Sequence, residues 1–311
     1  MSEQTGVEVW RGGVNTWECD EMGHMNVRFY VAKAMECVAG LAAELGMPGA
    51  FTPHTNATLV VRDIHVRFLR EAHAGAMLSA EAGVLDIAED SLCALLIMRH
   101  ADGQPAATCQ VNLSHATARD GLPFPWPAKV LEQAQRLRVN LPDIAKARSV
   151  DLSPFESAAS LEAAHRLGLL RIGLGVISPQ DCDVFGRMRP DVYIGRISDG
   201  VNGLVEPLRD IVASHAEPRP TRVGGAALEF HLVFLDWPRA GARYELRSGV
   251  MTADAKTFHL IHWMVDPDTG RPWGTAKAVA TAFDLDARKI VPIGPEASKA
   301  LAARFTPGLS R

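Results

Sequence analysis

The chain lacks the cysteine patterns of disulfide frameworks and of zinc ribbons. Its 311 residues include five cysteines, an odd and scattered set with no CxxC pair. That usage favours a reducing compartment over an oxidising one. We therefore expect a cytoplasmic protein without structural disulfides. The cysteines are Cys19, Cys37, Cys93, Cys109 and Cys182.

Long apolar segments and a strong charge imbalance are also missing. The longest clear apolar run, Leu92 to Met98, is far too short to span a bilayer. Residues Met1 to Thr5 contain neither a basic region nor an apolar stretch, so we expect no secretory signal. The net charge is −4 and the sequence pI is near 6.3, which give no reason to expect nucleic acid or a membrane as partner.

The chain does contain an internal repeat with a constant offset of 163 positions. Residues 18–41 and 181–204 share eight identities without a gap, where chance would give about one or two. The length is typical of two domains, and an apolar content of 47% lets each bury a core. We infer a duplicated unit. The identical pairs are Cys19/Cys182, Asp20/Asp183, Gly23/Gly186, Met25/Met188, Tyr30/Tyr193, Val38/Val201, Gly40/Gly203 and Leu41/Leu204.

Both halves show the same order of expected elements, a strand, a helix and then an antiparallel run of strands. In the first half we expect a helix at 27–45 and strands at 7–14, 58–70, 77–87, 92–100 and 106–117. In the second half we expect a helix that starts at Pro190 and ends before Pro207, with strands at 169–178, 226–235, 242–252, 257–265 and 272–283. This order predicts domains at 1–125 and 166–311, joined by a connector at 126–165 with helical stretches at 130–137 and 157–167.

The loop and helix that open the first repeat resemble a known family. The segment from Asp20 to Tyr30 reads DEMGHMNVRFY, and Glu36 follows six residues later. It resembles the Asp-x-x-Gly-His-x-Asn loop and central helix of 4-hydroxybenzoyl-CoA thioesterase-like proteins. The resemblance covers the first repeat well, the second weakly and the connector not at all. It implies an α+β chain of two tandem hotdog folds, each a central helix wrapped by an antiparallel sheet, that together form an intrachain pseudo-dimer.

The same resemblance implies an acyl-thioesterase that hydrolyses an acyl-CoA to a carboxylic acid and free CoA, without metal or cofactor. Asp20 would act as general base or nucleophile, and the backbone N–H of Val27 or Arg28 would stabilise the oxyanion. His24 and Asn26 would contact the thioester or order the loop. The alternative for Asp20 is that it only caps the helix or loop.

The second repeat keeps Asp183 but differs where the chemistry would take place. Because proline has no N–H, Pro190 cannot supply the backbone donor expected of the first repeat. Arg187 and Arg189 are of the kind that binds acidic or phosphate groups. We therefore expect the second site to serve binding and structure more than turnover. The replacements are Arg187 for His24, Arg189 for Asn26 and Pro190 for Val27.

Other residues in the pattern have simpler interpretations. Tyr30 and Tyr193 are typical packing residues, Glu36 stands too far along the helix for a catalytic role, and Cys19 is expected to be a small buried side chain. The pair Cys19 and His24 alone is too few ligands for zinc. We expect the remaining histidines of the first half to be structural or exposed, because no ligand spacing links them. They are His65, His73, His100 and His115.

Two rival functions remain at this point. One is a non-catalytic hotdog protein that binds an acyl-CoA or a related ligand, for which the altered second motif is a precedent. The other is the dehydratase branch of the fold, whose Asp and His pair has a different spacing that is not found here. Homo-oligomers of the pseudo-dimer are left open by the sequence, as is the identity of the acyl chain.

Overall fold

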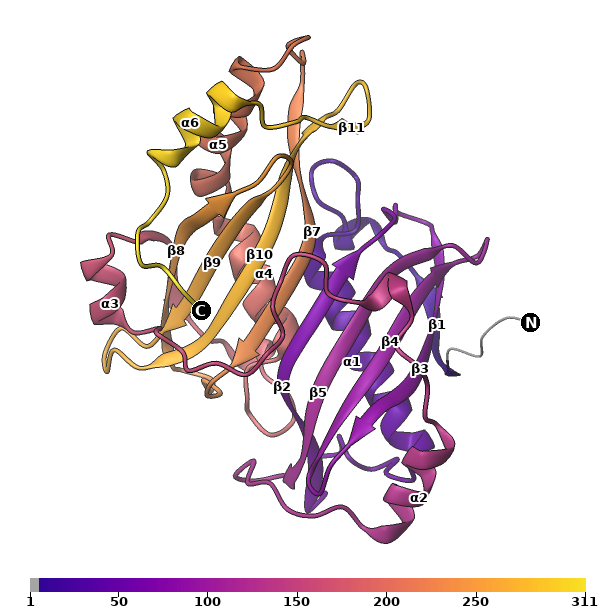
Figure 1. Cartoon of the computed structure of the whole chain (residues 1–311). Helices are drawn as coiled ribbons and strands as arrows, with labels where there is room; N and C mark the ends of the chain where they lie inside the picture. Colours follow the sequence, from indigo (N-terminus) through magenta and orange to yellow (C-terminus); the bar gives the residue numbers. More distant parts are fainter. Residues whose placement is uncertain (1–5) are drawn as a thin grey trace. The chain divides into compact units, whose positions relative to one another are not determined.

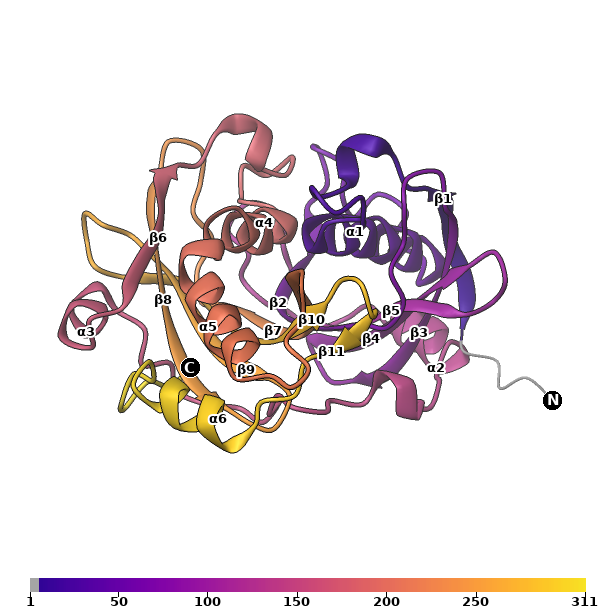
Figure 2. The same cartoon turned by 90° about the horizontal axis from the view of Figure 1, so that it is seen from above.

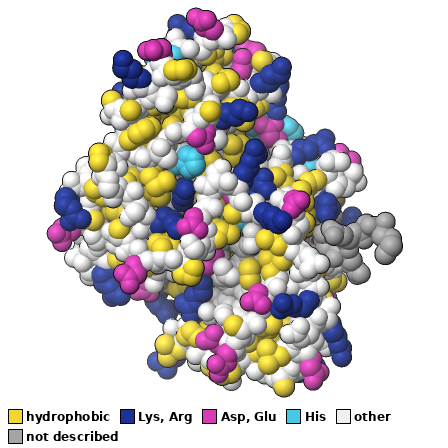
Figure 3. All heavy atoms as spheres, in the orientation of Figure 1, with side chains coloured by type: hydrophobic (Ala, Val, Ile, Leu, Met, Phe, Trp, Pro, Cys, Tyr) yellow, Lys and Arg dark blue, Asp and Glu magenta, His cyan; other side chains and the backbone are white. Residues whose placement is uncertain are grey.

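The computed structural model describes residues 6–311 and divides into two compact units. Unit 1 comprises Met1–Ala147 with Gln180–Ile194, and unit 2 comprises Arg148–Pro179 with Gly195–Arg311. Residues 1–5, on which the expectation of no secretory signal rests, lie outside the described residues. Within residues 6–311, no helix is both long and apolar enough to cross a membrane. Acidic and basic side chains are interspersed on the face that Figure 3 shows.

Unit 1 contains a five-stranded antiparallel sheet with the strand order β1-β3-β4-β5-β2. The central helix α1 (Val27–Glu44) packs against β1, β3 and β4 and lies across one face of this sheet (Figures 1 and 2). The short helix α2 follows the last strand and contacts β3. The strands are β1 (Val7–Gly13), β2 (Ala57–Phe68), β3 (Met77–Ile87), β4 (Ser91–His100) and β5 (Pro105–Thr117), and the short helices are η1 (Thr16–Glu18), α2 (Ala128–Arg136) and η2 (Asp143–Ala145).

The helix α1 can lie close to its sheet because its inner face combines apolar and small residues. Tyr30, Ala34, Val38 and Leu41 recur at helical spacing and are buried. At Gly40, an added Cβ would lie only 2.6 Å from the carbonyl oxygen of Val9 in β1. Gly40 therefore lets α1 approach β1 more closely than a residue with a side chain would allow.

Unit 2 repeats this arrangement with the strand order β6-β8-β9-β10-β7, and the short strand β11 pairs with β10. The helix α5 packs against β6, β7 and β10, and α6 contacts α5 and β8. The two sheets have corresponding strand orders, which confirms the predicted pair of tandem hotdog folds. The strands are β6 (Leu170–Val176), β7 (Val223–Phe234), β8 (Arg243–Ala253), β9 (Phe258–Val265), β10 (Pro272–Asp284) and β11 (Lys289–Ile290), and the helices are α3 (Leu161–Arg166), η3 (Pro179–Asp181), α4 (Pro190–Gly200), α5 (Asn202–Ser214) and α6 (Pro295–Ala302).

The expected end of the second central helix is wrong. The helix α4 ends at Gly200, and α5 then continues through Pro207 to Ser214. Proline removes one hydrogen bond from a helix interior, but Val205, Leu208 and Val212 are buried on the inner face of α5. Packing of this apolar face therefore outweighs the local signal of Pro207. The expected helix at 157–167 also shortens to α3, because the Ser160 side chain accepts from the Ala163 N–H (3.1 Å) and caps it there.

Candidate active site

The loop before α1 is a short hairpin closed by paired backbone hydrogen bonds. Asp20 N–H donates to His24 O (2.8 Å), and Asn26 N–H donates to Glu18 O (2.9 Å). Gly23 sits at the turn with a φ of +78°, a left-handed conformation that glycine adopts without strain. These bonds place Asp20 and His24 on the two paired limbs of one loop, directly before the helix start.

The Asp20 carboxylate organises this loop through one of its two oxygens. Its Oδ1 accepts hydrogen bonds from Met22 N–H (2.9 Å) and His24 N–H (3.1 Å). Among the described residues, no partner is found for its Oδ2. The carboxylate therefore caps the loop, which is the alternative role considered for Asp20. Its other oxygen is still available for a ligand.

The two candidate oxyanion donors differ in their surroundings. Asn26 is the N-cap of α1, and its Oδ1 accepts from Arg28 N–H (2.9 Å). The Val27 N–H, in contrast, has no acceptor within residues 6–311. Since helix N-termini carry partial positive charge and unpaired N–H groups, the Val27 amide is suited to an oxyanion and the Arg28 amide is already engaged.

A buried ion pair that the sequence reasoning did not single out holds the loop to α1. Glu18 Oε1 lies 2.8 Å from Lys33 Nζ, and the exposed fractions of the two side chains are only 11% and 6%. The other carboxylate oxygen of Glu18 accepts from Asn15 N–H (2.7 Å), and Lys33 also donates to Gly13 O (3.3 Å). The retained charge of Glu18 and Asp181 in the repeat was the available signal for it.

His24 is surrounded by groups from the turn between β2 and β3. Its Nε2 lies 3.4 Å from Glu71 Oε2, and its ring meets that of His73 edge-on with centroids 4.8 Å apart. His73 is exposed, as expected, but its Nδ1–H also donates to Gly23 O (3.2 Å). His24, Glu71 and His73 are the described residues whose ligand atoms lie close enough together to hold a metal ion.

Tyr30 and Glu36, the two residues of the motif that lie within α1, make contacts with other parts of the fold. Tyr30 is buried, its hydroxyl accepts from Ala72 N–H (3.2 Å), and its ring packs edge-on against Phe68. Burial raises the pKa of Tyr30 to about 12. The Glu36 carboxylate accepts from the Trp10 indole (2.6 Å), and within the described residues no hydrogen bond joins it to the loop. The interpretation of Tyr30 as a packing residue agrees with these contacts.

The loop of the second repeat has the same geometry as the first. Asp183 Oδ1 accepts from Phe185 N–H (2.8 Å) and Arg187 N–H (2.9 Å), and Asp183 N–H donates to Arg187 O (2.7 Å). Gly186 again turns the chain with a positive φ of +75°. The shared sequence of the two loops therefore encodes a shared backbone.

The arginines of the second loop are engaged by the protein itself. Arg187 is buried, donates to Ala118 O and lies over the Phe185 ring at 5.2 Å. Arg189 donates to Gln180 O (3.0 Å) and to the Asp191 carboxylate (3.0 Å). Their observed contacts are structural, within unit 1.

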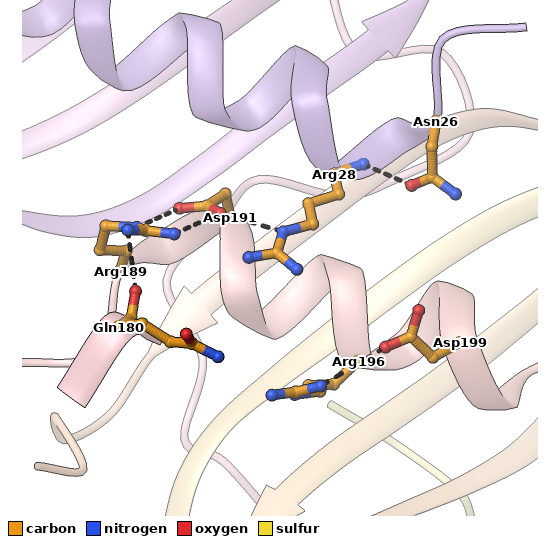
Figure 4. Close-up of polar contacts among 7 residues, drawn as sticks. All are labelled: Asn26, Arg28, Gln180, Arg189, Asp191, Arg196 and Asp199. Atoms are coloured by element: carbon orange, nitrogen blue, oxygen red, sulfur yellow. Dashed lines mark hydrogen bonds and ion pairs between the residues drawn. The ribbon is translucent and has the colours of Figure 1, made fainter. Parts of the chain in front are cut away.

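Asp191 connects the starts of α1 and α4. Its carboxylate is buried and accepts from Arg28 Nε (3.2 Å) as well as from Arg189, so that it lies between two guanidinium groups (Figure 4). Burial opposes the charged form of Arg189, but the bond and attraction to Asp191 outweigh it and raise its pKa. The charge of the Arg28 side chain is thus paired with a carboxylate at the start of α4.

None of the five cysteines forms a disulfide in the described part of the chain. Cys19 is half-buried, less than expected, and its Sγ lies 3.5 Å from Asn15 O. Burial raises the pKa of Cys37 and of Cys93 to about 12, which keeps both thiols protonated. A cysteine nucleophile would need a paired base, and none is found beside Cys19 in the described chain.

The sequence matches the family model of the thioesterase-like superfamily over residues 14–134 and 177–301, which is more than half of the chain. The first range includes α1 and the strands β2 to β5, and the second includes α4, α5 and the strands β7 to β10. The chain therefore belongs to the thioesterase-like superfamily. The comparison with curated protein sequences gives no significant match.

Solved structures of three thioesterases superpose on most of the chain. An oleoyl thioesterase structure from Lactobacillus plantarum covers 87% of this chain and 94% of its own, with a TM-score of 0.65 and 10% identity. The 12:0-ACP thioesterase from Umbellularia californica covers 88% and 93%, with a TM-score of 0.63 and 11% identity. An acyl-ACP thioesterase from Bacteroides thetaiotaomicron covers 87% and 96%, with a TM-score of 0.62 and 12% identity. At such low identity, the likeness establishes the fold.

Proposed function

We propose that this protein is an acyl-thioesterase that hydrolyses an acyl-CoA to a carboxylic acid and free CoA. Membership of the thioesterase-like superfamily supports hydrolysis of a thioester. The observation that carries the proposal is that two suitable groups stand close together in the sequence, one in the first loop and one at the start of α1. Asp20 has a carboxylate oxygen without a protein partner, and Val27, seven positions later, has a backbone N–H without an acceptor in the described chain. Thioester hydrolysis requires one group of each kind.

The proposed reaction uses these groups in sequence. Asp20 Oδ2 takes a proton from water, whose oxygen forms a bond to the acyl carbon, or it attacks that carbon directly. The thioester oxygen becomes negatively charged, and the Val27 N–H at the positive end of α1 stabilises it. In the general-base route the C–S bond then breaks, the CoA thiolate leaves and takes the proton from Asp20, and the carboxylic acid remains. In the nucleophilic route the C–S bond breaks and leaves the acyl group on Asp20 as a mixed anhydride, which water then hydrolyses to the carboxylic acid and the free Asp20 carboxylate.

His24 and Asn26 support these steps from the same loop. Asn26 caps α1 through its side chain and thereby orients the first amides of the helix. We assign to His24 a contact with the thioester, since its side chain is 17% exposed and therefore reachable by a ligand. We assign to Asp183, Arg187 and Arg189 a structural role in the second loop.

An acyl carrier protein is the second candidate for the thiol partner. Two of the superposed structures are named for acyl-ACP substrates, and each covers at least 87% of this chain. CoA and carrier protein present the acyl group on the same phosphopantetheine thiol, so the proposed chemistry is unchanged. The odd and scattered set of cysteines supports a reducing, cytoplasmic compartment for either substrate.

A thiol-release assay tests the proposal. The full chain would be incubated with acyl-CoAs of increasing chain length and with the matching acyl carrier proteins, and free thiol would be followed over time. We expect turnover of at least one acyl-CoA. Turnover of acyl carrier proteins alone would favour the second candidate. Binding of acyl-CoA without thiol release from any substrate would favour the non-catalytic hotdog protein.

A further inference from the structure

Three side chains able to bind a metal ion converge beside the first loop. His24 belongs to that loop, whereas Glu71 and His73 belong to the turn between β2 and β3. One ligand atom from each residue lies within 4.8 Å of the other two. We propose that His24, Glu71 and His73 bind a divalent transition-metal ion, with Zn²⁺ as the favoured ion.

The spacing of the three groups is close to that of a zinc site. Zinc binds imidazole nitrogen and carboxylate oxygen at about 2.0–2.2 Å, so that neighbouring ligand atoms of a tetrahedron lie about 3.3–3.6 Å apart. His24 Nε2 and Glu71 Oε2 are already 3.4 Å apart. The ligand atom of His73, whose side chain is exposed, lies within 4.8 Å of the other two.

The His73 ring is held in the tautomer that a metal requires. A carbonyl oxygen only accepts hydrogen bonds, so the contact between His73 Nδ1 and Gly23 O (3.2 Å) places the proton on Nδ1. The lone pair is then on Nε2. Metal-binding histidines commonly donate their other N–H to a backbone carbonyl in this way.

The backbone around the three side chains is fixed in advance. Met25 N–H donates to Ala72 O (2.7 Å), and Ala72 N–H donates to the buried Tyr30 hydroxyl (3.2 Å). A bridge of backbone hydrogen bonds also pairs His24 with His73. Because both segments are tied together, ion binding has to order only side chains.

The donor set determines which ions are expected. Two imidazoles and a carboxylate suit zinc and its neighbours, and three protein ligands leave a fourth position for water. Magnesium prefers oxygen ligands and holds its water tightly, so it is expected to bind poorly. The second repeat has Arg187 at the position of His24, so the site exists in only one repeat.

A bound ion has a consequence for turnover that rests on the proposed function. Coordination through Nε2 would immobilise the His24 ring, to which the proposed function assigns a contact with the thioester. Zinc should therefore lower the rate of thioester hydrolysis. Metal binding itself does not depend on that function and is measured separately.

Isothermal titration of the metal-free full chain with ZnCl₂ tests the site. We expect one Zn²⁺ per chain, with affinity reduced at least about tenfold in Glu71→Gln and in His73→Asn, since even supporting residues of metal sites contribute that much. The matched control is His54→Asn, which removes an exposed histidine of the same unit outside the cluster and should leave zinc affinity unchanged. MgCl₂ should give no saturable binding.

A second readout separates the metal site from the catalytic proposal. Zinc at saturating concentration should raise the melting temperature of the wild-type chain and of His54→Asn, but much less that of the two cluster variants. Zinc affinity that is the same in Glu71→Gln, His73→Asn and the wild type would overturn the site. A chain that hydrolyses thioesters but binds no zinc would overturn the site and leave the proposed function standing. A chain that binds zinc through these residues but hydrolyses no thioester would confirm the metal site and overturn the proposed function.

Discussion

Asp20 and Asp183, which lie 163 positions apart in the sequence, accept the same pair of backbone hydrogen bonds through Oδ1. One of these carboxylates precedes a helix that starts with Val27, and the other precedes a helix that starts with Pro190. The loop geometry is therefore independent of the backbone donor that follows it. Any catalytic difference between the loops should arise from the helix start and from the residues beside it.

Val27→Pro should remove the proposed oxyanion donor without disturbing the helix. Proline is well suited to the first helical position, and Asn26 before it has the extended conformation (φ −63°, ψ 145°) that proline requires. We expect the turnover number for thioester hydrolysis to fall by about 10², the typical loss for one oxyanion donor. The melting temperature should change little.

The control for that variant is Val27→Ala, which shortens the same side chain and keeps the N–H. It should retain most of the wild-type rate. If Val27→Pro and Val27→Ala lose activity equally, the backbone donor is not the cause, and the assignment of Val27 fails.

Glu18→Gln should lower the free energy of unfolding by about 3–5 kcal/mol, because it leaves the buried Lys33 ammonium without a counter-charge. Urea denaturation followed by circular dichroism would measure the change. The matched control is Glu8→Gln, which breaks the exposed pair with Arg11 and should have no measurable effect. Equal stability of the two variants would show that the Glu18–Lys33 pair does not stabilise the fold.

The buried His262 should make unit 2 sensitive to acid. Burial lowers the pKa of His262 from its ordinary 6.5 to about 3. Between these values the unfolded chain binds a proton that the folded chain does not, so the free energy of unfolding falls as the pH falls from 6.5 toward 3. His262→Gln removes this pH dependence of the free energy of unfolding. The variant keeps an amide that can contact the Ser248 hydroxyl, which lies 2.7 Å from His262 Nδ1. The stability difference between wild type and variant should shift in favour of the variant across that range, and a constant difference would contradict it.

The strands and the first central helix could be predicted because their signals are local. Apolar or alternating segments bounded by turn residues mark the strands, and the repeat offset transfers the strand order from one half to the other. The prediction that the second central helix ends before Pro207 was wrong. The packing of Leu208 and Val212 outweighs the effect of the proline, and a short stretch of sequence does not reveal that packing. Tertiary packing overrides propensity in such cases.

The loop motif located the candidate site, but the sequence could not show the partners that come from elsewhere in the chain. Arg28 and Asp191 occupy equivalent positions of the two repeats, and their ion pair (3.2 Å) becomes visible only when the chain is folded. Glu71 and His73 are likewise found beside His24 only in the folded chain, because they belong to the turn after β2. Such contacts depend on topology, and no spacing rule encodes them.

The most direct measurement compares the thioester hydrolysis rates of Asp20→Asn and Asp183→Asn. An asparagine Oδ1 can still accept the two backbone hydrogen bonds, so both variants should fold and melt like the wild type. We expect Asp20→Asn to lose about 10² or more of the turnover number, as for removal of a general base, and Asp183→Asn to lose little. An Asp20→Asn enzyme that keeps about half of its activity, with the rest lost only on adding Asp183→Asn, would show two working sites and contradict a single catalytic loop.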